Sequence, residues 1–211
     1  MKIYASMLAA NSSCFGEELR KVSDADGIHW DIMDGSFVDA ISFGAEVVRS
    51  LRKQTQQIFD VHLMVKNPEK HIETFANAGA NIITVHAEAT HHLHGTLQKI
   101  KSLGKKSGVA INPATSIEFL PYVLDVLDVV LIMTVNPGKS GQTFIMQQID
   151  KIKRVTEVIS DKIEICVDGG INEKTILPCV NAGAKNFVVG SRIFNSDNYS
   201  EAIKKLRGYS Y

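Results

Sequence analysis

Eight short β-rich runs recur along the chain, and longer stretches with helical spacing of apolar residues lie between them. We expect strands over residues 3–8, 28–33, 58–64, 82–87, 108–112, 129–135, 163–168 and 186–190. Segments with helical spacing lie between them, for example over residues 42–53, 68–78, 94–103, 117–124, 144–159 and 173–181. Eight consecutive strand–helix units favour an α/β fold, a single (β/α)8 TIM barrel that spans residues 1–211. A doubly wound open sheet is the competing architecture, but eight units exceed what most such sheets contain.

Two near-copies of one tetrapeptide mark expected helix ends. The sequence Asn-Ala-Gly-Ala occurs at residues 77–80 and again at residues 181–184, in each case just before a predicted strand. Glycine is favoured where a helix ends because it adopts the left-handed backbone conformation that closes the last turn. Gly79 and Gly183 are therefore expected to terminate the helices that precede them.

The charge balance and the termini exclude several classes of partner. The chain has 23 Lys+Arg and 23 Asp+Glu, which leaves no bulk positive field to hold a nucleic acid or an anionic membrane. The first apolar run breaks at residues 11–13, too early for a signal peptide or a membrane span. We therefore expect a soluble, cytoplasmic protein with no nucleic-acid and no membrane partner. The three cysteines are widely spaced with no CxxC motif, so we expect reduced and mostly buried thiols.

Polar residues that can bind metal lie at the ends of three predicted strands. Because side chains alternate along a strand, His29 and Asp31 share one face of the second strand. His62 lies at the end of the third strand, and Asp168 ends the seventh. In a (β/α)8 barrel these strand ends meet at one mouth. Two imidazoles and two carboxylates suit Zn²⁺ but also Fe²⁺, Mn²⁺ or Co²⁺, so the ligand types alone do not choose the metal.

Three methionines occupy matching positions near the same strand ends, namely Met33, Met64 and Met133. Thioethers near a metal can act as copper ligands, but beside two histidines and two aspartates we expect a soft, polarisable lining for the site. Filling of the hydrophobic core is the other interpretation of these three side chains.

Glycine-rich loops follow the sixth, seventh and eighth predicted strands, at residues 136–142, 168–170 and 189–191. Barrels commonly bind phosphate through backbone N–H groups at these loops. A metal site, a phosphate subsite and paired carboxylates together indicate proton transfer beside the carbonyl of a phosphorylated sugar. Two aspartates on opposite sides of a planar enediolate would produce the epimer, provided that one is ionised and the other is protonated.

The sequence resembles the ribulose-phosphate 3-epimerase family in order and nearly without gaps from residue 6 to residue 194. The motifs that carry the resemblance are HWDIMDGSFV (29–38), DVHLMVKNP (60–68), NPATSIEFL (112–120), LIMTVNPGKSGQTFI (131–145), VDGGI (167–171) and VGSRIF (189–194). The resemblance implies interconversion of D-ribulose 5-phosphate and D-xylulose 5-phosphate in the pentose phosphate pathway. It also implies one divalent metal ion per subunit, with Zn²⁺ favoured, and a homo-oligomer.

The resemblance also implies a role for each matching position. His29, Asp31, His62 and Asp168 would hold the metal, and for one direction Asp31 would accept the proton that leaves and Asp168 would donate the one that arrives. Ser6 and His62 would contact the sugar. The remaining positions that would hold substrate, chiefly its phosphate, are Gly138, Lys139, Ser140, Gly141, Gly169, Gly170, Gly190 and Ser191.

The sequence departs from the family pattern in the first strand, where Tyr4-Ala5-Ser6 replaces the usual Ala-Pro-Ser, and in two loops. After the MDG triplet the family usually has His-Phe-Val-Pro-Asn, whereas Ser36, Asp39 and Ala40 stand at three of these positions here. Lys139 and Ser140 replace an aromatic residue and a glycine. Because these loops border the substrate, a 3-epimerase of another ketose phosphate, such as D-allulose 6-phosphate, is the alternative.

Other classes fit the sequence less well. Related decarboxylases and hexulose-phosphate synthases use an Asp-x-Lys-x-x-Asp motif that the sequence lacks. A non-catalytic sugar-phosphate-binding barrel would tolerate loss of a metal ligand or acid, whereas all four are present. The histidines at 91, 92 and 94 are expected in a solvated turn, and His86, at a strand end, is the better candidate to line the site.

Overall fold

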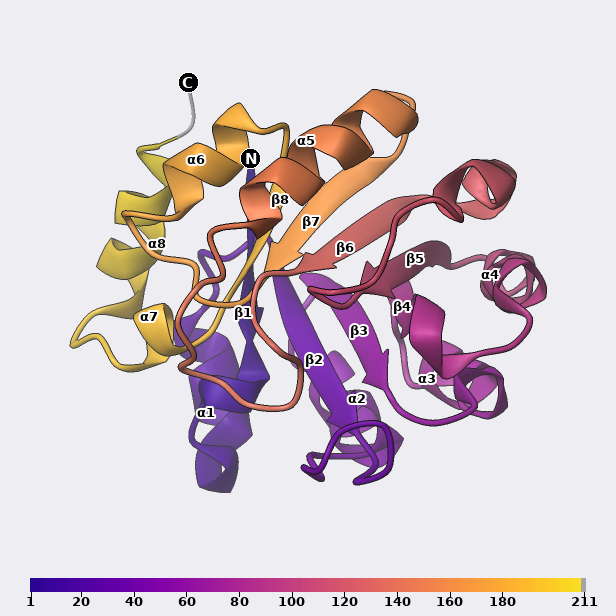
Figure 1. Cartoon of the computed structure of the whole chain (residues 1–211). Coiled ribbons are helices and arrows are strands. Elements are labelled where there is room, and N and C mark those ends of the chain that lie inside the picture. The colour runs from indigo at the N-terminus through magenta and orange to yellow at the C-terminus, as the bar shows by residue number, and fades with distance from the viewer. Residues whose placement is uncertain (210–211) are drawn as a thin grey trace.

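The computed structural model describes residues 1–209 and contains a closed barrel of eight strands (Figure 1). Neighbouring strands are parallel throughout, and β1 pairs with β8 to close the barrel. The strands are β1 (Lys2–Ser6), β2 (Gly27–Met33), β3 (Ile58–Met64), β4 (Ile82–His86), β5 (Lys106–Ile111), β6 (Val129–Met133), β7 (Glu164–Asp168) and β8 (Asn186–Val189). The predicted (β/α)8 barrel is confirmed, and each predicted strand overlaps an observed one.

Helices surround the barrel (Figure 1). They are α1 (Phe15–Lys21), α2 (Ala45–Arg52), α3 (Ile72–Asn77), α4 (Leu93–Ser102), α5 (Gln148–Val158), α6 (Ile176–Asn181), α7 (Ser191–Phe194) and α8 (Tyr199–Arg207). Short 3-10 turns are η1 (Met7–Ala9), η2 (Ser12–Cys14), η3 (Pro68–Lys70), η4 (Ala87–Ala89), η5 (Leu120–Tyr122) and η6 (Leu124–Val126). Gly79 and Gly183 follow α3 and α6 with φ of 103° and 109°, as expected for residues that terminate helices.

The predicted helix over residues 117–124 is wrong. The structure has only the two 3-10 turns η5 and η6 between β5 and β6. Pro121 lies in the middle of the predicted segment, and a proline there removes an N–H donor and clashes with the carbonyl four residues earlier. The apolar side chains of this segment, including Ile117 and Leu120, are still buried against the barrel.

Alternation along the strands separates two apolar layers. Trp30 of β2 faces outward and packs edge-on against the rings of Phe15, Phe43 and Phe59 in the layer between barrel and helices. A second, smaller cluster with residues from β1, β4, β5, β6, β7 and β8 fills the barrel interior. Tyr4 belongs to this inner cluster, and its ring lies so close to Gly27 that a Cβ there would clash with it. The polar residues at the carboxyl ends of the inward-facing strand positions therefore lie at the mouth of the barrel.

The three thiols agree with the expectation of reduced and mostly buried cysteines. In residues 1–209 Cys166 and Cys179 are buried, Cys14 is half-buried, and all three are free. Over the same residues, no helix combines the length and the apolar character that crossing a membrane requires.

Candidate active site

Four predicted ligands meet at the carboxyl ends of β2, β3 and β7. One nitrogen or carboxylate oxygen from each of His29, Asp31, His62 and Asp168 lies within 4.8 Å of the others. Strand register explains part of this geometry, because Asp31 pairs directly with His62 across the β2–β3 ladder. Asp31 Oδ1 is 3.3 Å from both His29 Nε2 and His62 Nδ1, and Asp168 Oδ2 is 3.9 and 3.8 Å from the same two nitrogens.

The donor set fits a divalent cation. His29 donates from Nδ1 to Asp60 Oδ2 at 2.9 Å, which leaves Nε2 as the nitrogen that faces Asp31 and the cluster. This buried Nε2 finds no hydrogen-bond partner in the described part of the chain. A buried polar atom without a partner is costly, and a metal ion is one way to satisfy it. Among the described residues, no other group of three or more His, Cys, Asp or Glu side chains converges in this way.

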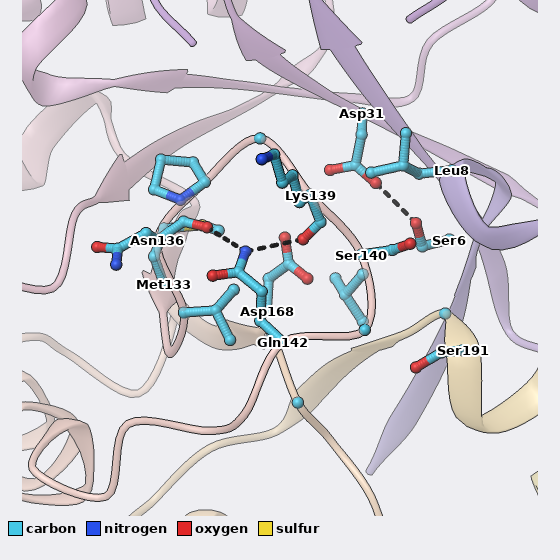
Figure 2. A pocket seen from close by; sticks show the side chains of 18 of the residues that line it. Ser6, Leu8, Asp31, Met133, Asn136, Lys139, Ser140, Gln142, Asp168 and Ser191 are labelled. Atoms are coloured by element: carbon cyan, nitrogen blue, oxygen red, sulfur yellow. Dashed lines mark hydrogen bonds between the residues drawn. The ribbon is translucent and has the colours of Figure 1, made fainter. Parts of the chain in front are cut away.

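The site also contains a polar partner that the sequence analysis did not identify. Asp60 is buried on β3, two residues before His62, and its carboxylate holds His29 in the tautomer just described. The alternation Asp60, His62, Met64 on one strand face was the available signal. On the other side of the cluster, Ser6 Oγ donates to Asp31 Oδ2 at 2.7 Å (Figure 2).

The two aspartates of the cluster differ in protonation. Burial opposes ionisation of Asp31, but the adjacent imidazoles of His29 and, next, of His62 outweigh it and hold the pKa of Asp31 far below its ordinary value. Burial, and next the negative charge of Asp31, raise the pKa of Asp168 to about 7. In the metal-free protein one carboxylate is therefore held ionised, while the other is about half protonated near pH 7.

The raised pKa of Asp168 predicts that Asp168→Asn stabilises the metal-free protein at high pH. The pKa of Asp168 rises from its ordinary 3.8 to about 7 on folding, so the wild-type stability from this group is lost as the pH rises through that window. Asparagine does not titrate. The variant should therefore gain roughly 2 to 4 kcal/mol over wild type between pH 4 and pH 7 and keep that gain above pH 7.

Urea unfolding in the presence of a chelator, repeated at several pH values, measures this difference. Using the difference between variant and wild type removes most of the contribution of other groups that titrate in the same range, such as His62, whose pKa burial lowers to about 4. A difference in unfolding free energy that does not change between pH 4 and pH 7 contradicts the assignment for Asp168.

A pocket opens above the four ligands, and Figure 2 shows Asp31 and Asp168 among the residues that line it. Met33, Met64 and Met133 also line it, beside the carboxylates. Of the residues expected to hold substrate, those that line this pocket are Ser6, Gly138, Lys139, Ser140, Gly141, Gly169, Gly170, Gly190 and Ser191. His62 is fully buried beneath them.

Backbone conformation makes the glycine loops suited to present N–H groups. Gly169 and Gly170 have φ of 121° and 67°, and a Cβ at Gly169 would clash with a methyl group of Val135. The loop between β6 and α5 is closed by Gln142, whose side-chain amide donates to the carbonyls of Asn136 and Lys139 (Figure 2). Of the described residues that line the pocket, Lys139 is the only one with a basic side chain.

The loops that depart from the family pattern lie against one another. A Cβ at Gly138 would be 3.2 Å from Cβ of Val38, so the loop after β2 contacts the loop after β6. A shallow surface groove between them is lined by three of the departing residues, Asp39, Ala40 and Lys139. The departures therefore gather at one edge of the site.

Of the other histidines considered in the sequence, three are exposed as expected, but the expectation that His86 lines the site is wrong. His91, His92 and His94 are exposed around the start of α4, and His94 contacts only the carboxylate of Asp125 at 3.2 Å among the polar contacts found. His86 is fully buried at the end of β4. It does not line the pocket but lies behind His62, with 2.8 Å between their Nε2 atoms.

The fold and the site define a (β/α)8-barrel protein whose mouth brings together two histidines and two aspartates that can hold a divalent cation. A sequence profile of the ribulose-phosphate 3-epimerase family matches residues 2–194. The chain belongs to this family of enzymes.

Individual relatives and a solved structure agree. Two proteins named ribulose-phosphate 3-epimerase are similar: that of Synechocystis sp. is 46% identical, covering 96% of this chain and 91% of the relative, and that of Bacillus subtilis is 43% identical, covering 99% of each. A crystal structure of 3-keto-L-gulonate-6-phosphate decarboxylase from Vibrio cholerae superposes with a TM-score of 0.74 over 100% of this chain and 99% of that chain. At 14% identity this last likeness shows the fold alone.

Proposed function

We propose that this enzyme interconverts D-ribulose 5-phosphate and D-xylulose 5-phosphate by metal-dependent proton transfer at C3. The observation that carries the proposal is the pair Asp31 and Asp168. Both carboxylates line one pocket, they come from strands that β8 and β1 separate in the barrel, and their pKa values are displaced in opposite directions. An ionised base and a protonated acid at one site suit removal of a proton from one face and delivery of a proton to the other.

The metal ligands proposed are His29, Asp31, His62 and Asp168, and the ion proposed is Zn²⁺, one per subunit. The same mixture of nitrogen and oxygen donors also suits Fe²⁺, Mn²⁺ or Co²⁺. When bound, the ion supplies positive charge that stabilises the enediolate oxygens formed when the C3 proton leaves.

The proton steps fall to the two aspartates. Asp31 accepts the C3 proton of one epimer, and the C–H electron pair becomes the C2–C3 double bond of the enediolate while the carbonyl oxygen takes the charge. Asp168 then delivers its own proton to the opposite face of C3, which restores the carbonyl and inverts the centre. Asp31 ends protonated and Asp168 ionised, which is the state required for the reverse direction.

Contacts around the pocket support a phosphorylated substrate. The glycine loops after β7 and β8 offer backbone N–H groups, and Lys139 offers one positive charge. Met33, Met64 and Met133 provide a polarisable surface suited to a flat intermediate. These features favour a small sugar phosphate as the ligand. Because the chain has 23 basic and 23 acidic residues, such a ligand would be held by these local groups and not by a positively charged surface.

A comparison of substrates tests the proposal. We expect kcat/KM for D-ribulose 5-phosphate to exceed that for D-allulose 6-phosphate by at least about tenfold, which corresponds to about 1.4 kcal/mol of transition-state binding. The measurement is a coupled assay of each ketose phosphate with metal-loaded enzyme. A higher kcat/KM for D-allulose 6-phosphate would replace the proposed substrate without changing the reaction.

D-allulose 6-phosphate is retained as the alternative substrate because several loop residues differ from the family pattern. Ser36, Asp39, Ala40, Lys139 and Ser140 differ from the family pattern, and Asp39 and Lys139 line one groove at the pocket edge. A hexulose phosphate places one more hydroxymethylene unit between C3 and the phosphate, so it would need more room at this edge. The same two aspartates would carry out the chemistry.

A further inference from the structure

A row of buried polar groups leads away from the proposed metal site on the side of His62. His62 Nε2 lies 2.8 Å from His86 Nε2, and His86 Nδ1 lies 3.2 Å from Glu88 Oε2. Both imidazoles are fully buried, and their rings are stacked with centroids 4.9 Å apart. Phe37, from the loop after β2, covers His86 with its ring centroid 4.6 Å away. None of the steps proposed above uses His86 or Glu88.

The direction of each hydrogen bond in this row follows from its outer end. The Glu88 carboxylate only accepts, because hydrogen bonds from His86, from Thr115 and from the Asn112 backbone N–H outweigh burial and lower its pKa to about 2. His86 must therefore donate from Nδ1. In a neutral imidazole the other nitrogen then accepts, so His86 Nε2 receives the N–H of His62 Nε2.

The position of the proton on His62, at the inner end of the row, follows as well. With its proton on Nε2, His62 presents the lone pair of Nδ1 to the cluster, where Asp31 Oδ1 lies 3.3 Å away. In this tautomer no proton lies between the two atoms, so a cation bound there would satisfy both of them.

We propose that Glu88 and His86 form a positioning relay that holds His62 in the tautomer able to bind the metal. The inference rests on the proposed function, because it assigns a purpose to two side chains outside the ligand set. Hydrogen-bond partners beyond the ligands commonly fix the tautomer and orientation of metal-binding histidines. Neither residue lines the pocket, so in this proposal both act through His62.

Glu88→Gln tests the relay sharply because it changes the direction of the hydrogen bonds with little change in shape. Glu88 accepts from the Asn112 N–H through Oε1 at 2.9 Å and from His86 through Oε2. A glutamine has only one oxygen, and the Asn112 N–H can only donate. If that oxygen stays on Asn112, the side-chain NH₂ faces His86 Nδ1 and donates to it. His86 then donates to His62 Nε2, and the proton of His62 moves to Nδ1, where it blocks the metal.

The experiment measures Zn²⁺ affinity by competition with a chromophoric chelator, using the full-length metal-free protein. We expect Glu88→Gln to weaken Zn²⁺ binding by about 10- to 100-fold. Glu88→Ala removes the outer partner without reversing it and should weaken binding less. A role in packing alone predicts the opposite order, because glutamine keeps the shape of glutamate and alanine does not.

A matched control is Glu164→Gln. Glu164 begins β7 at the other end of the barrel, its side chain is 23% exposed like that of Glu88, and it accepts from Lys2 and Asn186. This variant should bind Zn²⁺ as wild type does. Nitrogen-15 NMR of the metal-free protein adds a readout independent of metal, in which the proton of His62 should lie on Nε2 in wild type and on Nδ1 in Glu88→Gln.

Equal Zn²⁺ affinity of Glu88→Gln and wild type, with an unchanged His62 tautomer, overturns the relay while leaving the metal site intact. If wild-type protein itself fails to bind one Zn²⁺ ion per chain, this result contradicts the proposed metal site, and the relay is contradicted together with it. The two failures are therefore distinguished by the wild-type titration alone.

Discussion

Asp168→Asn is expected to lower kcat for epimerisation by about 10²- to 10⁴-fold, in both directions. The amide cannot donate a proton to C3 in one direction or accept one in the other, and microscopic reversibility makes both steps obligatory. The measurement is the steady-state rate from each epimer with metal-saturated enzyme. Asp31→Asn should lower kcat by a similar factor.

Two observations separate this loss from damage to the fold. The metal-free Asp168→Asn protein is expected to be more stable than wild type above pH 7, because the buried carboxylate beside Asp31 is gone. Asp128→Asn serves as the control, since Asp128 lies just before β6, at the other end of the barrel, and accepts from Lys101 and the Ser107 N–H. This control should keep kcat. A normal rate for either active-site variant contradicts the two-aspartate mechanism.

Removal of the metal is the second change with a large expected effect. Dialysis against a chelator should lower epimerase activity by at least about 10²-fold, since the enediolate then forms without the charge that stabilises it. Activity should return on addition of Zn²⁺, Mn²⁺, Fe²⁺ or Co²⁺, and the rank of the four ions identifies the metal that suits the site. Metal content measured in parallel should approach one ion per chain in the active preparation.

The same treatment should lower the melting temperature. An ion at 100 times its dissociation constant adds about 2.7 kcal/mol to the free energy of unfolding. Full activity in a preparation that contains far less than one ion per chain contradicts the metal role.

The barrel and the four ligands follow from rules that operate along the strands. Alternation places His29 and Asp31 on one face of β2, and parallel register sets Asp31 beside His62, so a pattern of residue types is enough to bring them together. Glycine at the ends of α3 and α6 is a local signal of the same kind. A proline inside an apolar segment was also visible in the sequence, and Pro121 should have excluded the helix predicted over residues 117–124.

The outer partners of the site could not be predicted in this way. Whether His86 meets His62 depends on how two rings rotate in a packed interior, and strand spacing does not determine ring rotation. The direction of the hydrogen bonds depends further on Glu88, which lies in η4 after β4 has ended. The contact between the loops after β2 and β6, through Val38 and Gly138, is set by the tertiary packing of segments a hundred residues apart.

Incorporation of solvent deuterium at C3 tests the central claim most directly. Wild-type enzyme in D₂O, supplied with D-ribulose 5-phosphate, should form D-xylulose 5-phosphate that carries deuterium at C3, because the proton removed goes to one aspartate and the proton delivered comes from the other, which has exchanged with solvent. Asp168→Asn should at most exchange the C3 proton of one epimer without inverting it. Product that retains the original hydrogen at C3 contradicts proton transfer by two opposed carboxylates.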